Sequence, residues 1–271
     1  MKCACLFVAH NIMNIKDKII LVTGGANGIG KALCERFYED GAKKIIVTDI
    51  DFENATEVAK RVDGVAHRLD VSNEAQVKRV VEDVLEKFGR IDFVCSNAGI
   101  GGAEGCLEVS NEIWQKIYEI NVLSHVYLAR AAFPSMIEKG SGAFMITSSA
   151  AGLLTHPTAT PYVVSKHGAV ALAESLAIEF GEKIYVSCLC PQGVKTDLIM
   201  GENNPNWFLM PEAISAEECA DAVVKSLEKE SFLILPHSEV ADYIVKKAEN
   251  RDRWLHSLRK MRTAVLSAKN S

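Results

Sequence analysis

Residues 18–30 read KIILVTGGANGIG, and this stretch decides the expected fold. A short apolar, β-branched run is typical of a buried strand, and KALCERFYED after it has the composition of a helix with Leu33, Phe37 and Tyr38 on one side. Glycines at such a junction let the backbone approach a pyrophosphate, which the free N–H groups of the helix N-terminus stabilise. The stretch therefore predicts a dinucleotide-binding turn from Gly24 to Gly30.

An acidic residue is expected at the end of the second strand. Asp49, in KKIIVTDID, lies nineteen positions after Gly30, where its carboxylate can accept both hydroxyls of a ribose and repel a 2′-phosphate. Binding of NADP would require a compensating cation nearby. Because Asn27 precedes Gly28 and Ile50 follows Asp49, no cation is placed for this purpose, and the sequence predicts NAD as the cofactor.

Length and composition favour one large domain. The chain has 271 residues, a hydrophobic fraction of 48% and a formal net charge of −5, which suit a three-layer α/β domain and provide no basic field for nucleic acid. No apolar stretch approaches the roughly 20 residues that cross a bilayer. Residues 1–16 are expected to be an N-terminal extension, because MKCACLFVAHNIM lacks the long apolar region of a signal peptide and Met13 is a natural start. We therefore expect the protein to be cytoplasmic.

The eight cysteines show no Cys-x-x-Cys or Cys/His ligand spacing, so the sequence predicts no metal site. Most are interpreted as small buried hydrophobes of a protein in a reducing compartment.

Strand and helix patterns alternate along the chain. This alternation predicts a doubly wound parallel sheet, a Rossmann fold, with right-handed crossovers and helices on both faces. Ligands of such sheets bind beyond the carboxyl ends of the strands, where all the motifs named here fall. The expected strands are 18–23, 44–49, 65–69, 91–96, 142–148, 183–190 and 231–236, and the expected helices are 28–40, 51–62, 72–88, 110–138, 160–181, 215–229 and 238–262.

A pair of residues suited to proton transfer lies in PYVVSKHGAVALAESLAIEF. Tyr162 and Lys166 are four positions apart in a helical pattern and so share one face. A tyrosine hydroxyl titrates near about 10, and a fixed ammonium beside it is expected to lower this pKa and to make it a usable acid and base. Ser149, thirteen positions upstream, completes the group.

The chain resembles the classical short-chain dehydrogenase/reductase family over about residues 17–260. The resemblance rests on the glycine turn, Asp70, Asn97-Ala98-Gly99, Asn121, Ser149, Tyr162 and Lys166. It implies that Tyr162 exchanges the proton, that Lys166 lowers its pKa and binds the nicotinamide ribose, and that Ser149 binds the substrate oxygen. Asn121 is expected to hold a relay water. Spacing favours Ser149 over Ser148.

The resemblance also implies the residues that contact the cofactor. The family usually has Pro-Gly after the sixth strand, whereas this chain has Pro191-Gln192-Gly193, so the glycine is displaced by one and Gln192 is expected to reach the substrate. The expected cofactor contacts are Gly24, Asn27, Gly28, Ile29, Gly30, Asp49, Ile50, Asp70, Val71, Asn97, Ala98, Gly99, Tyr162, Lys166, Val194 and Thr196.

An apolar substrate pocket is expected under a lid of about residues 197–214, where Trp207 and its neighbours offer a large apolar surface. Leu153, Leu154 and His156 precede Tyr162, with the histidine expected to face water. No Arg or Lys is placed to bind a carboxylate or phosphate, so a lipophilic secondary alcohol or its ketone is expected. The expected substrate contacts are Ser149, Tyr162, Gln192 and Trp207.

The C-terminal helix, about 238–262, is basic and carries Trp254, Leu255, Leu258 and Met261 at helical spacing. It suits a membrane surface or a subunit interface, and the interface is favoured because the family usually forms dimers or tetramers. Two alternatives to an alcohol dehydrogenase stay open. One is an NAD-binding sensor without turnover, and the other is epimerase or enoyl reductase chemistry on the same fold.

Overall fold

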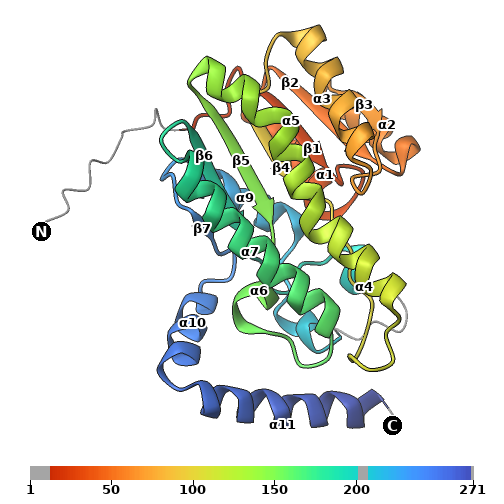
Figure 1. Ribbon diagram of the computed structural model, residues 1–271, viewed down its shortest axis with the longest axis vertical. Helices are drawn as coiled ribbons and strands as arrows, with labels where there is room; N and C mark the ends of the chain where they lie inside the picture. Colours follow the sequence, from red (N-terminus) through yellow and green to blue (C-terminus); the bar gives the residue numbers. More distant parts are fainter. Residues whose placement is uncertain (1–12, 201–206, 270–271) are drawn as a thin grey trace, which may run out of the picture.

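The computed structural model describes residues 13–200 and 207–269 (Figure 1). Within these residues, seven parallel strands form one sheet in the order β3-β2-β1-β4-β5-β6-β7. This arrangement confirms the expected doubly wound α/β fold. The strands are β1 (Ile19–Thr23), β2 (Lys44–Asp49), β3 (Val65–Arg68), β4 (Phe93–Ser96), β5 (Gly142–Thr147), β6 (Ile184–Leu189) and β7 (Leu233–Ile234).

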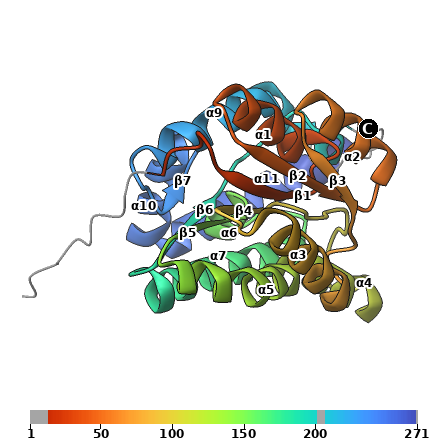
Figure 2. The same ribbon diagram turned by 90° about the horizontal axis from the view of Figure 1, so that it is seen from above.

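Helices connect successive strands and cover both faces of the sheet. Figure 2 shows α1, α2 and α9 on one face and α3, α5 and α7 on the other. The main helices are α1 (Gly28–Glu39), α2 (Phe52–Arg61), α3 (Glu74–Phe88), α4 (Asn111–Tyr118), α5 (Ser124–Lys139), α7 (Thr160–Phe180), α9 (Ala216–Leu227), α10 (Glu239–Glu249) and α11 (Arg251–Lys269). Shorter segments are α6 (Ala151–Leu154), α8 (Asp197–Met200) and a 3-10 helix at Trp207–Glu212.

Each face of the sheet has its own apolar core, because every strand in the middle of the sheet is buried on both sides. Leu33 and Phe37 of α1 pack with Phe93 on one face. Phe133 of α5 packs edge-on against Phe144 on the other, with ring centres 5.2 Å apart. Of the six described cysteines, all but Cys106 are buried. The two cores hold the strand ends that carry the site in fixed register.

Two helix boundaries differ from expectation. The helix expected at 110–138 contains a π-helical turn at Glu119–Leu123, between α4 and α5. The helix expected at 238–262 is broken at Asn250, which is extended (φ −147°, ψ 89°). Its side-chain oxygen accepts a hydrogen bond from the Arg253 backbone N–H at 2.9 Å, so Asn250 ends α10 and caps α11.

No helix within residues 13–200 and 207–269 is long and apolar enough to cross a membrane.

The turn between β1 and α1 requires glycine at two positions. Gly24 has φ +65°, a conformation that other residues adopt only with strain. A Cβ on Gly30 would overlap the carbonyl oxygen of Gly24 and lie 2.7 Å from the side-chain nitrogen of Asn97. The backbone of the turn can fold this tightly only because both side chains are absent.

We expect Gly30→Ala to lower the free energy of unfolding and to weaken the binding of NADH by tenfold or more, because the new methyl group would displace the turn. Gly168→Ala in α7 is the matched control. Its Cβ would meet Val122 at 3.4 Å, an ordinary contact, so the free energy of unfolding should stay equal or rise by up to about 1 kcal/mol. Urea unfolding and NADH fluorescence titration measure both effects, and equal behaviour of the two variants would contradict the assignment.

Candidate active site

Two connected cavities lie beyond the carboxyl ends of the strands. The first, of about 400 Å³, runs from the glycine turn and Asp49 to Tyr162 and Lys166. The second, of about 940 Å³, runs from Tyr162 to α11. Both are lined by Gly99, Ile100, Ser149, Tyr162, Gln192, Asp197, Leu198 and Ile199. Of the four residues predicted to be catalytic, Ser149 and Tyr162 thus lie at the junction of the two cavities. Lys166 lines the first cavity, and Asn121 is not among the lining residues of either.

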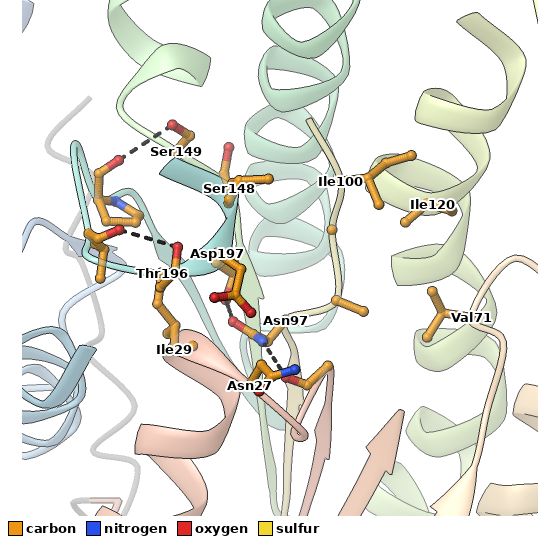
Figure 3. Close-up of a pocket in the computed structure, with 18 of the residues that line it drawn as sticks. Asn27, Ile29, Val71, Asn97, Ile100, Ile120, Ser148, Ser149, Thr196 and Asp197 are labelled. Atoms are coloured by element: carbon orange, nitrogen blue, oxygen red, sulfur yellow. Dashed lines mark hydrogen bonds between the residues drawn. The ribbon is translucent and has the colours of Figure 1, made fainter. Parts of the chain in front are cut away.

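The first cavity is lined by most of the predicted cofactor contacts, among them Gly24, Asn27, Asp49, Asn97 and Thr196. Figure 3 shows Asn27, Ile29 and Thr196 beside its floor. Ile100, Ile120 and Val71 form the opposite wall of this cavity (Figure 3). The sequence analysis predicted Val71 as a cavity residue but not Ile100 or Ile120, because these two isoleucines belong to no recognisable motif.

Asp49 is fixed by its own backbone surroundings. One carboxylate oxygen accepts the Ala26 N–H at 3.1 Å, and the other accepts the Asp51 N–H at 3.0 Å. Each oxygen keeps a second acceptor direction, and Asp49 lines the first cavity. The carboxylate is therefore oriented where a ribose would be recognised.

A cation does lie near Asp49, which corrects the expectation that none is placed there. Arg68 pairs in register with Asp49 across β2 and β3. Its guanidinium donates to the Ile50 carbonyl oxygen at 3.3 Å and lies 5.7 Å from the centre of the Phe52 ring. Arg68 is distant in sequence from Asp49, so only the strand pairing shows this proximity.

Asp70 acts as a turn cap in the structure. One of its carboxylate oxygens accepts from the backbone N–H of Ser72 at 3.0 Å and from the Ser72 hydroxyl at 2.7 Å. The residue also lines the first cavity beside Val71. These bonds order the turn after β3, and this turn carries Val71 into the wall of the cavity.

Asn121 lies in the π-helical turn, and both N–H groups of its side chain are donated to protein acceptors. Its amide oxygen accepts the Ile100 N–H at 2.9 Å, and its amide nitrogen donates to the Ile100 carbonyl oxygen at 2.9 Å and to the Ser165 hydroxyl at 3.0 Å. The turn thereby holds the Gly99–Ile100 segment against α7. Such π-helical turns are frequent at functional sites.

The two serines after β5 point to different partners. The hydroxyl of Ser148 donates to the Lys166 carbonyl oxygen at 2.8 Å and so supports α7. The hydroxyl of Ser149 accepts the Ala151 N–H at 3.1 Å and donates to the Pro191 carbonyl oxygen at 3.4 Å. The Ser149 side chain also acts on the phenol of Tyr162, in the direction that lowers the pKa of Tyr162. The geometry thus favours Ser149 over Ser148 as the partner of Tyr162.

Lys166 is buried, and its ammonium is hydrogen-bonded to the backbone at the end of β5. The ammonium donates to the Thr147 carbonyl oxygen at 2.9 Å and lies 5.7 Å from the centre of the Tyr162 ring. Burial lowers the pKa of Lys166 to about 8. Burial also raises the pKa of Tyr162 above its usual range, against a smaller opposing effect of the Ser149 side chain. The expected lowering of the Tyr162 pKa by Lys166 is therefore not found in this structure, because desolvation dominates.

The Pro191-Gln192-Gly193 loop is tied to α10 and to the segment before it. The Gln192 side chain donates to the Glu239 carboxylate at 3.0 Å, and the Gln192 backbone N–H donates to Nδ1 of His237 at 3.2 Å. Gln192 still lines both cavities, as predicted. The position of the Trp207 side chain lies outside the described residues.

The second cavity is mostly apolar. His156 lines it instead of facing water, and its Nδ1 accepts the backbone N–H groups of Thr158 and Ala159 at 3.3 Å. The C-terminal helices contribute Tyr243 of α10 and one side of α11. The apolar lining residues include Ile100, Ala103, Ala150, Ala151, Leu154, Pro157, Ala159, Leu198, Ile199, Pro211, Tyr243, Trp254, Leu258 and Met261.

With this geometry established, comparison with known proteins shows the family. The sequence model described as short chain dehydrogenase matches residues 18–207. The chain belongs to this family. A short-chain dehydrogenase/reductase from Burkholderia phymatum, solved in complex with NAD, superposes with a TM-score of 0.81 at 25% identity, covering 89% of this chain and 96% of that chain.

Two related proteins show what the chain is similar to. The 1-deoxy-11-beta-hydroxypentalenate dehydrogenase of Streptomyces exfoliatus is 32% identical over 253 residues, 90% of this chain and 91% of that protein. The mitochondrial borneol dehydrogenase of Lavandula x intermedia is 29% identical over 241 residues, 85% of this chain and 91% of that protein. Both relatives are named as dehydrogenases, and this chain is an oxidoreductase of the same family.

The buried ammonium of Lys166 predicts an unusual pH dependence of stability. Its folded pKa, about 8, is below its usual value of 10.5, so between these values the unfolded chain binds more protons and stability rises with pH. Lys166→Met removes this group. We expect the variant to be more stable than the wild type at pH 7, and the difference to shrink by up to about 3 kcal/mol by pH 10.

Urea unfolding at both pH values measures this difference. Lys183→Met, which changes an exposed lysine at the start of β6, is the control and should show no such change with pH. A difference between wild type and Lys166→Met that is constant from pH 7 to pH 10 would contradict the burial argument.

Proposed function

We propose that this protein is an NAD(H)-dependent oxidoreductase that interconverts a lipophilic secondary alcohol and its ketone by hydride transfer, with Tyr162 as general acid and base. The observation that carries the proposal is the position of Ser149 and Tyr162 at the junction of the two cavities. One cavity has the glycine turn and carboxylate that suit a dinucleotide, and the other is apolar.

The first cavity fits NAD on structural grounds. At Gly28, a Cβ would lie 2.9 Å from the Thr196 side chain, so glycine keeps the entrance to α1 open. Backbone N–H groups at the start of α1 suit the pyrophosphate, and Asp49 suits the adenosine ribose. The bound cofactor would supply hydride transfer to and from the carbon that carries the substrate oxygen. Lys166 is assigned to the nicotinamide ribose, and Val194 and Thr196 to the carboxamide.

The residues at the junction can handle the proton and the substrate oxygen. Burial keeps the phenol of Tyr162 neutral, so it is available as a proton donor to the oxygen of a ketone. Ser149 lines both cavities together with Tyr162, and we assign it to bind the same oxygen. With a pKa of about 8, Lys166 is mostly protonated at pH 7 and can stabilise the phenolate that remains.

The surface of α7 supports assembly into a homodimer or homotetramer. Val164 is 48% exposed and Ile178 is 86% exposed on this helix, and a second copy of the chain would bury them. We place this oligomer in the cytoplasm, where the five buried thiols would stay reduced. Sedimentation velocity measures the mass in solution.

Tyr162→Phe removes the hydroxyl and keeps the ring. We expect kcat for alcohol oxidation to fall at least 1,000-fold while NADH binding changes less than threefold, because the lost group supplies the proton and not the cofactor contacts. Tyr118→Phe is the control, since Tyr118 is 46% exposed and lies outside both cavities. Retention of a tenth of the wild-type kcat in Tyr162→Phe would refute the mechanism.

Cofactor choice is expected to depend on Asp49 opposed by Arg68. The wild type should prefer NAD over NADP by about 100-fold in kcat/KM, on the order of 2–3 kcal/mol, because the carboxylate repels a 2′-phosphate. Asp49→Ala should narrow this ratio. Asp49→Ala/Arg68→Met should narrow it less, because the guanidinium near Ile50 is then missing. Equal kcat/KM for both cofactors in the wild type would show that Asp49 does not select NAD.

A further inference from the structure

The C-terminal helix α11 has one apolar side and one basic side. It follows the matched region, which ends at residue 207. Arg253, Arg259, Lys260 and Arg262 are exposed, whereas Trp254, Leu258 and Met261, at positions i, i+4 and i+7, line the second cavity. The apolar side of α11 therefore faces the active site, and its basic side faces solvent.

Two partly buried hydrogen bonds, one from the start of α11 and one from the end of α10, fix this helix to the rest of the domain. The indole N–H of Trp254 donates to the Leu154 carbonyl oxygen at 3.0 Å. The ammonium of Lys247 donates to the Leu153 carbonyl oxygen at 2.5 Å. Both acceptors lie in α6, just after Ser149, and Figure 1 shows α11 running beyond α6. The cavity wall formed by α11 is thereby held at a set distance from Ser149.

Past this anchor, the apolar side of α11 is covered unevenly, since Val265 is buried but Met261 is not. Met261 is 45% exposed although it faces the cavity. The only charged side chains among the described lining residues of the second cavity are Asp197 and Glu212, and both are acidic. A carboxylate or phosphate in this space would be repelled, whereas an uncharged apolar molecule would bury the exposed surface.

We propose that Trp254, Leu258 and Met261 form a distal subsite that selects substrates with an uncharged, bulky apolar body extending away from the reacting carbon. This inference rests on the proposed function for the chemistry at Tyr162, and it adds the substrate class and the residues that read it. The occupant of the apolar side of α11 is the substrate itself, because the cavity it lines continues to Ser149 and Tyr162.

The test compares two alcohols that differ in size. It also compares two variants, one on the cavity side of α11 and one on its solvent side. With NAD, kcat/KM for 2-decalol should exceed that for cyclohexanol by at least tenfold, because the second ring reaches the subsite. Leu258→Glu, on the cavity side of α11, should lower this ratio at least tenfold. Leu255→Glu, at a position 44% exposed and outside both cavities, should leave the ratio within twofold.

Binding of Nile red, an uncharged lipophilic dye, provides a readout that needs no turnover. Its fluorescence enhancement should be weakened at least fivefold by Leu258→Glu and not by Leu255→Glu. If the dye shows this difference but neither alcohol is oxidised, the subsite stands and the proposed function fails. Equal effects of the two variants on the dye and on the alcohol ratio overturn the subsite. So does a loss of oligomer mass in Leu258→Glu without a change in either readout, which would assign the apolar side to a subunit interface.

Discussion

The side chain of Asn97 joins the ends of three strands, and the site depends on this junction. Its amide nitrogen donates to the Thr23 carbonyl oxygen at 3.0 Å, and its amide oxygen accepts from the Thr147 hydroxyl at 3.1 Å. The hydroxyl of Thr23 accepts the Asn97 N–H in return. Because the carbonyl oxygen of Thr147 also accepts from the ammonium of Lys166, one network links the glycine turn of the first cavity to Lys166. A shift in the turn would therefore reach Lys166 through two side chains.

Much of this arrangement follows from local sequence. The turn at 23–30 can be predicted from its glycines, because only glycine tolerates the crowding at Gly30. The spacing of Tyr162 and Lys166 places them on one side of α7 because a helix repeats every 3.6 residues. Alternation of strands and helices then predicts a parallel sheet, whose carboxyl edge collects the motifs. The fold class, most strand positions and the residues around the junction of the two cavities could be predicted in this way.

The remainder depends on contacts between distant segments, which periodicity does not encode. Arg68 lies beside Asp49 only because β2 and β3 pair in that register. The π-helical turn at Asn121 forms where its side chain bonds both the N–H and the carbonyl of Ile100, twenty-one residues away. The pKa of Tyr162 depends on how deeply the folded chain buries the phenol. The helical spacing that places Lys166 nearby was therefore insufficient to predict whether this pKa is raised or lowered.

Gln192, which occupies the usual glycine position in the Pro191-Gln192-Gly193 loop, has a physical role in this arrangement. A glycine at position 192 would leave the Glu239 carboxylate without the amide to which it is bonded at 3.0 Å. With Gln192 present, the loop that lines the first cavity beside Ser149 and Tyr162 is tied to the first turn of α10, and Lys247 ties the last turn of α10 to α6. Both ends of α10 are thus bonded to segments that line the active site. The helix therefore sets the position of α11 relative to Ser149, and the size of the apolar cavity follows from polar contacts at its edges.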